Sequence, residues 1–276
     1  MHIGNKIKKR LSKVNSFLRS KKKPGKEDIH LLRLEVKHLE AFLQLMTAQK
    51  DFSAGPEIPH RLESLFHNAG KIRKFELGNK AIRSIIDKNG IFKPEDILKK
   101  LNASKRKSVK NLRKKRRSYP AFKPGDLAKH PDSKLANDTW QQFMGAQAAS
   151  ILNVLESDIL SDVRSLHQLR KILKSILYVL PIGKSAAAPV LSFLDGNKKI
   201  LKSVEAKIGL IHDLDFFIRW MDREQDTEQG PGRETLKTIM EDWKNDIERM
   251  KEDLRPSLPV IRQFALDLSQ NLRLYR

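Results

Sequence analysis

Apolar residues recur along most of this chain at intervals of three and four positions, the spacing that places them on one face of an α-helix. The clearest run comprises Leu236, Ile239, Met240, Trp243, Ile247, Met250 and Leu254. Alternation of apolar and polar residues, which is typical of a β-strand, is scarce. The pattern therefore predicts an all-α protein.

Segments rich in Gly and Pro separate the predicted helices, because these residues end helices. Helices are expected at 29–46, 57–77, 78–89, 94–117, 133–156, 158–180, 187–206, 207–222, 233–254 and 257–274. The turn-rich segment from Pro120 to Pro131 divides the chain in two. We expect two related helical repeats, at about 27–125 and 132–276, after a basic N-terminal arm or helix at 1–26.

A basic motif, His-x-x-Arg-x-x-x-Lys, occurs at the head of each half. Its two copies are His30, Arg33, Lys37 and, 137 residues later, His167, Arg170, Lys174. Positions i, i+3 and i+7 of an α-helix fall within about 60° of arc, so each copy forms one cationic line. The rest of each helix is strongly apolar, and unpaired charge in a dry core is costly. Each line must therefore face water, acidic partners or a hydrated channel.

The overall charge favours anionic partners. The 276 residues include 55 Lys and Arg against 33 Asp and Glu, a net charge of +22, while 39% hydrophobic residues suffice for a core. The segment 99–117 holds 11 Lys and Arg and no acid, with Arg106, Lys110, Arg113, Lys114 and Arg117 on one side of a helix. Nucleic acid, an anionic membrane and inorganic polyphosphate all remain candidates at this point.

At the two basic motifs the chain resembles the CHAD family, the conserved-histidine α-helical domains, whose halves each open with His-x-x-Arg-x-x-x-[Lys/Arg]. The segment from Leu201 to Asp213 is similar to the family's Leu-Lys-x-Leu-Gln-x-x-Leu-Gly-x-x-Asn/His-Asp element, and the segment from Gly70 to Glu76 is a weaker equivalent. The basic run that leads into Ser118-Tyr119-Pro120 stands where the family has an Arg-rich fourth helix. The resemblance covers about residues 27–276.

The resemblance implies two four-helix bundles related by a pseudo-two-fold axis, with a basic central groove or pore that binds inorganic polyphosphate without catalysis. The chain departs from the family at Glu40 and Leu177, where a further Arg is usual nearby, and at Lys74, where an Asp is usual. The expected polyphosphate-binding residues are His30, Arg33, Lys37, His167, Arg170, Lys174, Lys171, Lys71, Arg73, Lys74, Lys202, Lys207, Arg106, Lys110, Arg113, Lys114 and Arg117. A histidine beside phosphates is expected to shift toward its charged form.

Nucleic-acid binding is the main alternative, because the net charge and the 99–117 run serve it equally well. Three Tyr and three Trp offer few stacking platforms for single strands. A catalytic function is not expected: Gly183-Lys184-Ser185 lacks the glycine that a phosphate loop needs at Tyr178. A metal site at His212-Asp213, completed by His167 and Asp215, is the weaker alternative.

The remaining expectations concern cofactors and location. The chain has no cysteine, which excludes thiolate metal sites and disulfides, and we expect neither a cofactor nor a metal. Residues 1–26 carry ten Lys and Arg but not the apolar stretch of a secretory signal, and no run is long enough to span a bilayer. We therefore expect a cytoplasmic protein without membrane insertion, associated with polyphosphate granules if polyphosphate is its partner.

Overall fold

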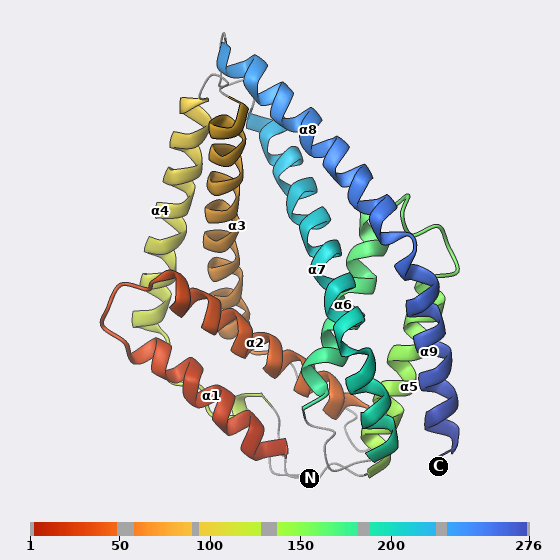
Figure 1. Ribbon diagram of the computed structural model, residues 1–276. Coiled ribbons are helices and arrows are strands. Elements are labelled where there is room, and N and C mark those ends of the chain that lie inside the picture. Colours follow the sequence, from red (N-terminus) through yellow and green to blue (C-terminus); the bar gives the residue numbers. More distant parts are fainter. Residues whose placement is uncertain are drawn as a thin grey trace.

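The computed structural model describes residues 3–48, 58–89, 94–127, 137–181, 188–224 and 231–274. All regular elements within these residues are helical, which confirms the predicted fold class (Figure 1). The α-helices are α1 (Ile3–Arg19), α2 (Lys26–Thr47), α3 (His60–Asn89), α4 (Glu95–Ser118), α5 (Asn137–Val154), α6 (Val163–Val179), α7 (Ala188–Glu224), α8 (Pro231–Leu254) and α9 (Ser257–Leu274). A short 3₁₀ helix, η1 (Pro124–Asp126), follows α4.

The helices form two groups that follow the order of the chain. In the first group α2 packs against α1 and α3, and α3 packs against α4; in the second, α7 packs against α6, α8 and α9, and α5 packs against α6 and α9. The groups meet where α2 packs against α6, near the bottom of Figure 1. This contact brings together the two helices that carry the basic motifs.

The groups also meet at the opposite end, through a second hydrophobic core. It joins Ile82 of α3 and three residues of α4 to side chains of α7 and α8, among them Phe217 and Trp243. At Gly78 of α3 the ring of Phe217 lies so close that an added Cβ would be 2.4 Å from it. Parts of α2, α3, α6 and α7 therefore surround the middle of the molecule, between the two contacts (Figure 1).

Two of the predicted helix breaks are wrong. Helix α3 continues through the expected break between 77 and 78, and α7 continues through the one between 206 and 207. A glycine inside a helix costs only about 1 kcal/mol, which the packing of Phe217 on Gly78 offsets. In α7 the residues Val204, Ile208 and Ile211 are all buried along one side, so packing holds the long helix together.

The basic N-terminal segment is part of the core and is not a solvated arm. Ile7, Leu11 and Val14 of α1 are buried in the main hydrophobic core. Arg10 binds both carboxylate oxygens of Glu35, at 3.2 and 2.9 Å, and the Nζ of Lys13 binds the same carboxylate at 2.9 Å. Glu35 is only 2% exposed, so these charges of α1 neutralise a buried acid of α2.

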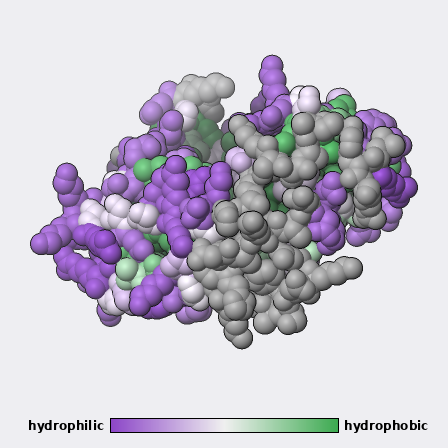
Figure 2. All heavy atoms as spheres, turned by 90° about the horizontal axis from the view of Figure 1, so that it is seen from below, coloured by the Kyte–Doolittle hydropathy of each residue, from purple (hydrophilic) through white to green (hydrophobic). Residues whose placement is uncertain are grey.

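Apolar side chains of α1 are buried, whereas the surface on this side of the molecule is polar. Seen from below, the side formed by α1 and α4 is covered mainly by hydrophilic residues (Figure 2). None of the described helices combines the length and the apolar character needed to cross a bilayer. The expected boundaries of the two repeats stay a prediction, since the residues between η1 and α5 lie outside those described.

Candidate functional site

The two basic motifs converge where α2 packs against α6. Lys37 of α2 and Lys174 of α6 are partly buried neighbours. Burial, followed by the positive charge of Lys174 and then that of Arg33, lowers the pKa of Lys37 to about 7. Two partly buried lysines side by side concentrate positive charge at this contact between α2 and α6.

Further cations from three helices surround this pair. Burial lowers the pKa of Arg33; Asp213 opposes that shift, while Arg170 and Arg73 add to it. Burial likewise lowers the pKa of Lys74, whose neighbours include Asp213, Arg33 and Arg170, and whose Nζ lies 3.7 Å from the ring centre of Phe216. We call this group the central cationic cluster: Arg33, Lys37, Arg73, Lys74, Arg170 and Lys174.

Two carboxylates of α7 neutralise part of the cluster. Glu205 Oε1 accepts hydrogen bonds from Arg170 Nε at 2.9 Å and from Lys174 Nζ at 2.8 Å. Burial raises the pKa of Glu205, but Lys174 and Arg170 outweigh it and hold that pKa below its usual value. Asp213 behaves in the same way, through His212 and Arg170. Six cations against two carboxylates leave a local excess of positive charge.

A glycine makes room for the arginine of each motif. A Cβ added to Gly70 of α3 would lie 2.5 Å from Arg33 Nη1, and one added to Gly209 of α7 would lie 2.7 Å from Arg170 Nη2. Each guanidinium therefore lies directly against the backbone of the helix that follows its motif. Arg33 is further held by the carbonyl of Phe66, which accepts a hydrogen bond at 3.4 Å.

The two leading histidines have different surroundings. His30 is exposed on α2. His167 stacks on His212 of α7, with ring centres 4.6 Å apart and planes 23° from parallel. Burial, His212 and the nearby Lys171 lower the pKa of His167 to about 4, so it is neutral at pH 7 in the free protein.

Several expected binding residues are exposed or are bonded to groups outside the cluster. Lys71 of α3 and Lys202 of α7 are exposed, and Lys207 donates to the carbonyl of Asp253 at 3.0 Å. Lys171 is exposed and lines a small hollow of about 410 Å³ with Gln44. Lys171 also lowers the pKa of His167, which places it beside the second basic motif.

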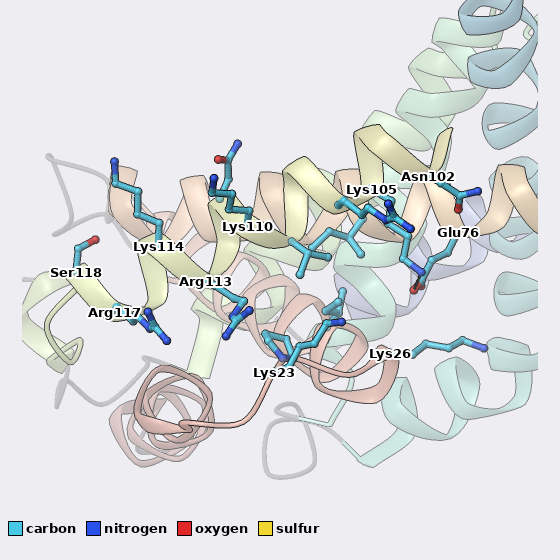
Figure 3. Close-up of a pocket in the computed structure, with 16 residues that line it drawn as sticks. Lys23, Lys26, Glu76, Asn102, Lys105, Lys110, Arg113, Lys114, Arg117 and Ser118 are labelled. Atoms are coloured by element: carbon cyan, nitrogen blue, oxygen red, sulfur yellow. Dashed lines mark ion pairs between the residues drawn. The ribbon is translucent and has the colours of Figure 1, made fainter. Parts of the chain in front are cut away.

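The basic face of α4 lines a separate pocket of about 1220 Å³. Its lining includes all five expected residues of this face, Arg106, Lys110, Arg113, Lys114 and Arg117. None of the six residues of the central cationic cluster lines it. Arg113 and Arg117 extend from α4 toward Lys23, which precedes α2, while Glu76, Asn102 and Lys105 lie together at the other end (Figure 3). The expected binding residues thus divide into two places.

The alternative of a metal site finds no support among the described residues. His212 Nδ1 lies 3.4 Å from Asp213 Oδ1, but the described residues contain no group of three or more His, Cys, Asp and Glu that could hold a metal ion. The segment Gly183-Lys184-Ser185 lies outside the described residues. Glu40, one of the departures from the family pattern, is exposed on α2, and Leu177 is partly buried on α6.

The sequence did not predict the roles of Glu205, Asp213, Gly70 and Gly209 in this site. All four residues occur in the two segments that resemble the family's sequence elements, and this resemblance was the only feature of the sequence that could have indicated them. No protein-family model matches the chain, and no curated protein matches it in a sequence search. Its function must therefore be argued from the geometry of the site.

Proposed function

We propose that this protein binds inorganic polyphosphate, without catalysis, at the central cationic cluster. The observation that carries this proposal is the partial burial of Lys37 beside Lys174, with Arg33 and Arg170 close by and with Glu205 and Asp213 as acids that offset part of the charge. Like charges held together in a region of reduced dielectric are unfavourable without an anionic partner. A polyanion bound there would relieve that repulsion.

The chemistry of the cluster suits phosphate. Arginine binds phosphate oxygens in a bidentate way, and lysine supplies a compact point charge. Polyphosphate carries a negative charge on every unit and presents no bases, so it needs many cations and no stacking surface. The residues that contribute are Arg33, Lys37, Arg73, Lys74, Arg170 and Lys174, with His167 as a neutral donor at the edge.

A thin polyanion suits this position better than a duplex does. The cations are partly buried among α2, α3, α6 and α7, in the middle of the molecule, and they are not spread over an outer surface. A nucleic-acid duplex needs a broad exposed surface for its phosphates, whereas a single chain of phosphates does not. Nucleic acid is the alternative that the experiment below must exclude.

We also propose that the halves are related by a pseudo-two-fold axis, as in the CHAD family that the motifs resemble. The pairing of Arg33 with Gly70 and of Arg170 with Gly209 supports this, because each motif arginine meets a glycine of the next helix. A cytoplasmic location, with association to polyphosphate granules, belongs to the same proposal.

Binding of long-chain polyphosphate is expected to weaken steeply with salt. Six cationic contacts give a slope of about −4 or steeper for log affinity against log salt concentration, because each contact releases counterions. Titration at several salt concentrations measures the slope, and competition with single- and double-stranded nucleic acid at near-physiological salt measures the preference. A flat salt response, or tighter binding of nucleic acid, would contradict the proposal.

Replacing Gly70 or Gly209 by alanine is expected to lower the affinity for polyphosphate without lowering the stability of the fold. Gly70→Ala and Gly209→Ala each place a Cβ where a motif guanidinium lies, so Arg33 or Arg170 must move. We expect a roughly tenfold loss of polyphosphate affinity for each variant, with a thermal midpoint equal to or above that of the wild type, because alanine favours helix. Gly196→Ala is the control, since nothing lies within 4 Å of its added Cβ. Equal affinity in all three variants would show that the arginine positions do not matter.

A further inference from the structure

The positive charge of this protein is concentrated in its first half. Residues 1–127 contain 33 Lys and Arg against 12 Asp and Glu, a net charge of +21. Residues 128–276 contain 22 against 21, a net charge of +1. The central cationic cluster draws on both halves, so it does not account for this imbalance. Eight of these 33 cations line the pocket beside α4.

The pocket beside α4 combines cations with one acid. Its cationic lining residues are Lys23, Lys26, Lys105, Arg106, Lys110, Arg113, Lys114 and Arg117. The acid is Glu76 of α3, whose Oε1 lies 2.8 Å from Lys105 Nζ. Its other oxygen, Oε2, is buried and has no hydrogen-bond partner. A buried acceptor without a partner is unfavourable, and a small rotation of the Glu76 carboxylate, which lines the pocket, would present Oε2 to a hydrogen-bond donor there.

The pocket also has apolar parts. Ile29 of α2, Ile72 of α3 and Val109 of α4 line it together with the cations. The described residues that line it include no aromatic ring on which successive bases could stack. A volume of about 1220 Å³ is slightly above the range of typical small-molecule sites. These features favour a compact ligand that bears several phosphates and also a less charged core.

We propose that this pocket binds a small organic polyphosphate, a molecule whose phosphates contact Arg113, Arg117 and Lys23 and whose core donates a hydrogen bond to Glu76. Nucleoside triphosphates, and inositol phosphates that keep free hydroxyls, both have this chemistry. Lys105 and Arg113 are eight residues apart on α4, about 12 Å along the helix axis, a span that an extended nucleoside triphosphate covers. Inorganic polyphosphate has no donor for Glu76 and is repelled by it, which distinguishes this pocket from the central cationic cluster.

The experiment is calorimetric titration of the full chain carrying Arg33→Gln and Arg170→Gln, which weakens the central cationic cluster, with ATP, GTP, inositol trisphosphate and inorganic tripolyphosphate at the same salt concentration. At least one organic ligand is expected to bind more tightly than tripolyphosphate, and the three organic arms identify which core the pocket prefers. Glu76→Gln is expected to weaken that organic ligand about tenfold, because a hydrogen bond to a charged acceptor is lost, and to leave tripolyphosphate binding equal or stronger.

Two double variants locate the site. In the Arg33→Gln, Arg170→Gln background, adding Arg113→Gln with Arg117→Gln is expected to weaken every ligand about tenfold or more, because the pocket beside α4 is then the main site left for them. The background alone is expected to bind the organic ligand as tightly as the wild type does. Circular dichroism checks that each variant folds. Failure of any organic ligand to exceed tripolyphosphate, an equal effect of Glu76→Gln on all ligands, or no effect of the α4 variant would overturn this inference. None of these results depends on whether the central cationic cluster binds long-chain polyphosphate.

Discussion

The double variant Arg33→Glu, Arg170→Glu is expected to raise the dissociation constant for long-chain polyphosphate by more than about 100-fold. Each arginine contributes a charge-assisted hydrogen bond of about 1.5–3 kcal/mol, and each new carboxylate adds repulsion. The effect exceeds that of losing two charges elsewhere because both guanidinium groups lie within the same cluster, near Lys37 and Lys174. Fluorescence or calorimetric titration measures the affinity.

The matched control is Lys6→Glu, Lys9→Glu on α1, which makes the same change in net charge at two exposed positions. We expect a loss of less than about threefold, as for screened charges far from the ligand. A carboxylate at position 170 would also face Glu205, so the neutral pair Arg33→Gln, Arg170→Gln checks that lost binding is not lost folding. Equal losses in the cluster and control variants would mean diffuse attraction to a basic protein, without a defined site.

Polyphosphate affinity is also expected to fall with rising pH, by up to about tenfold per pH unit between pH 7 and pH 9. In the free protein the pKa of Lys37 is about 7, lowered by burial and by Lys174. Bound phosphates favour the charged amine and raise that pKa. Below pH 7 the amine is already protonated and binding takes up no proton from it; above pH 7 binding must take up one, so alkaline pH weakens it.

The variant Lys37→Arg tests the origin of this pH dependence. An arginine stays protonated across the whole range, so its affinity is expected to be flat between pH 7 and pH 9 and to exceed that of the wild type at pH 9. His167, with a pKa of about 4, titrates below this window. An unchanged pH profile in Lys37→Arg would show that another group is responsible.

Helical periodicity predicted the fold class because it records which side of each helix is buried. It erred where tertiary contacts hold a helix together: separate helices were expected at 57–77 and 78–89, but the ring of Phe217 packs on Gly78 and α3 continues. The burial of helix α1 was not predicted, because its apolar residues Ile7, Leu11 and Val14 are interspersed with lysines. That spacing of three and four was a usable signal, which the charge of the segment obscured.

The sequence predicted which cations lie together on one helix face, but not which helix faces come into contact in the fold. Spacing places Arg33 with Lys37 and Arg170 with Lys174, whereas the approach of Lys37 to Lys174 depends on how α2 crosses α6. The pairing of Glu205 with the second line is likewise tertiary. The basic face of α4 was expected to share the site, but the structure places it in a pocket of its own.

The most direct test of the central claim, that cations from α2 and α6 meet at one polyphosphate site, is amine labelling read by mass spectrometry residue by residue. Lys37 and Lys174 are compared with Lys237 and Lys244, which are exposed on α8. We predict that long-chain polyphosphate lowers the labelling rate of Lys37 and Lys174 more than about tenfold, because it covers both amines and charges that of Lys37, while the α8 lysines are unchanged. Equal protection of all four lysines, or no protection of Lys37, would contradict the account.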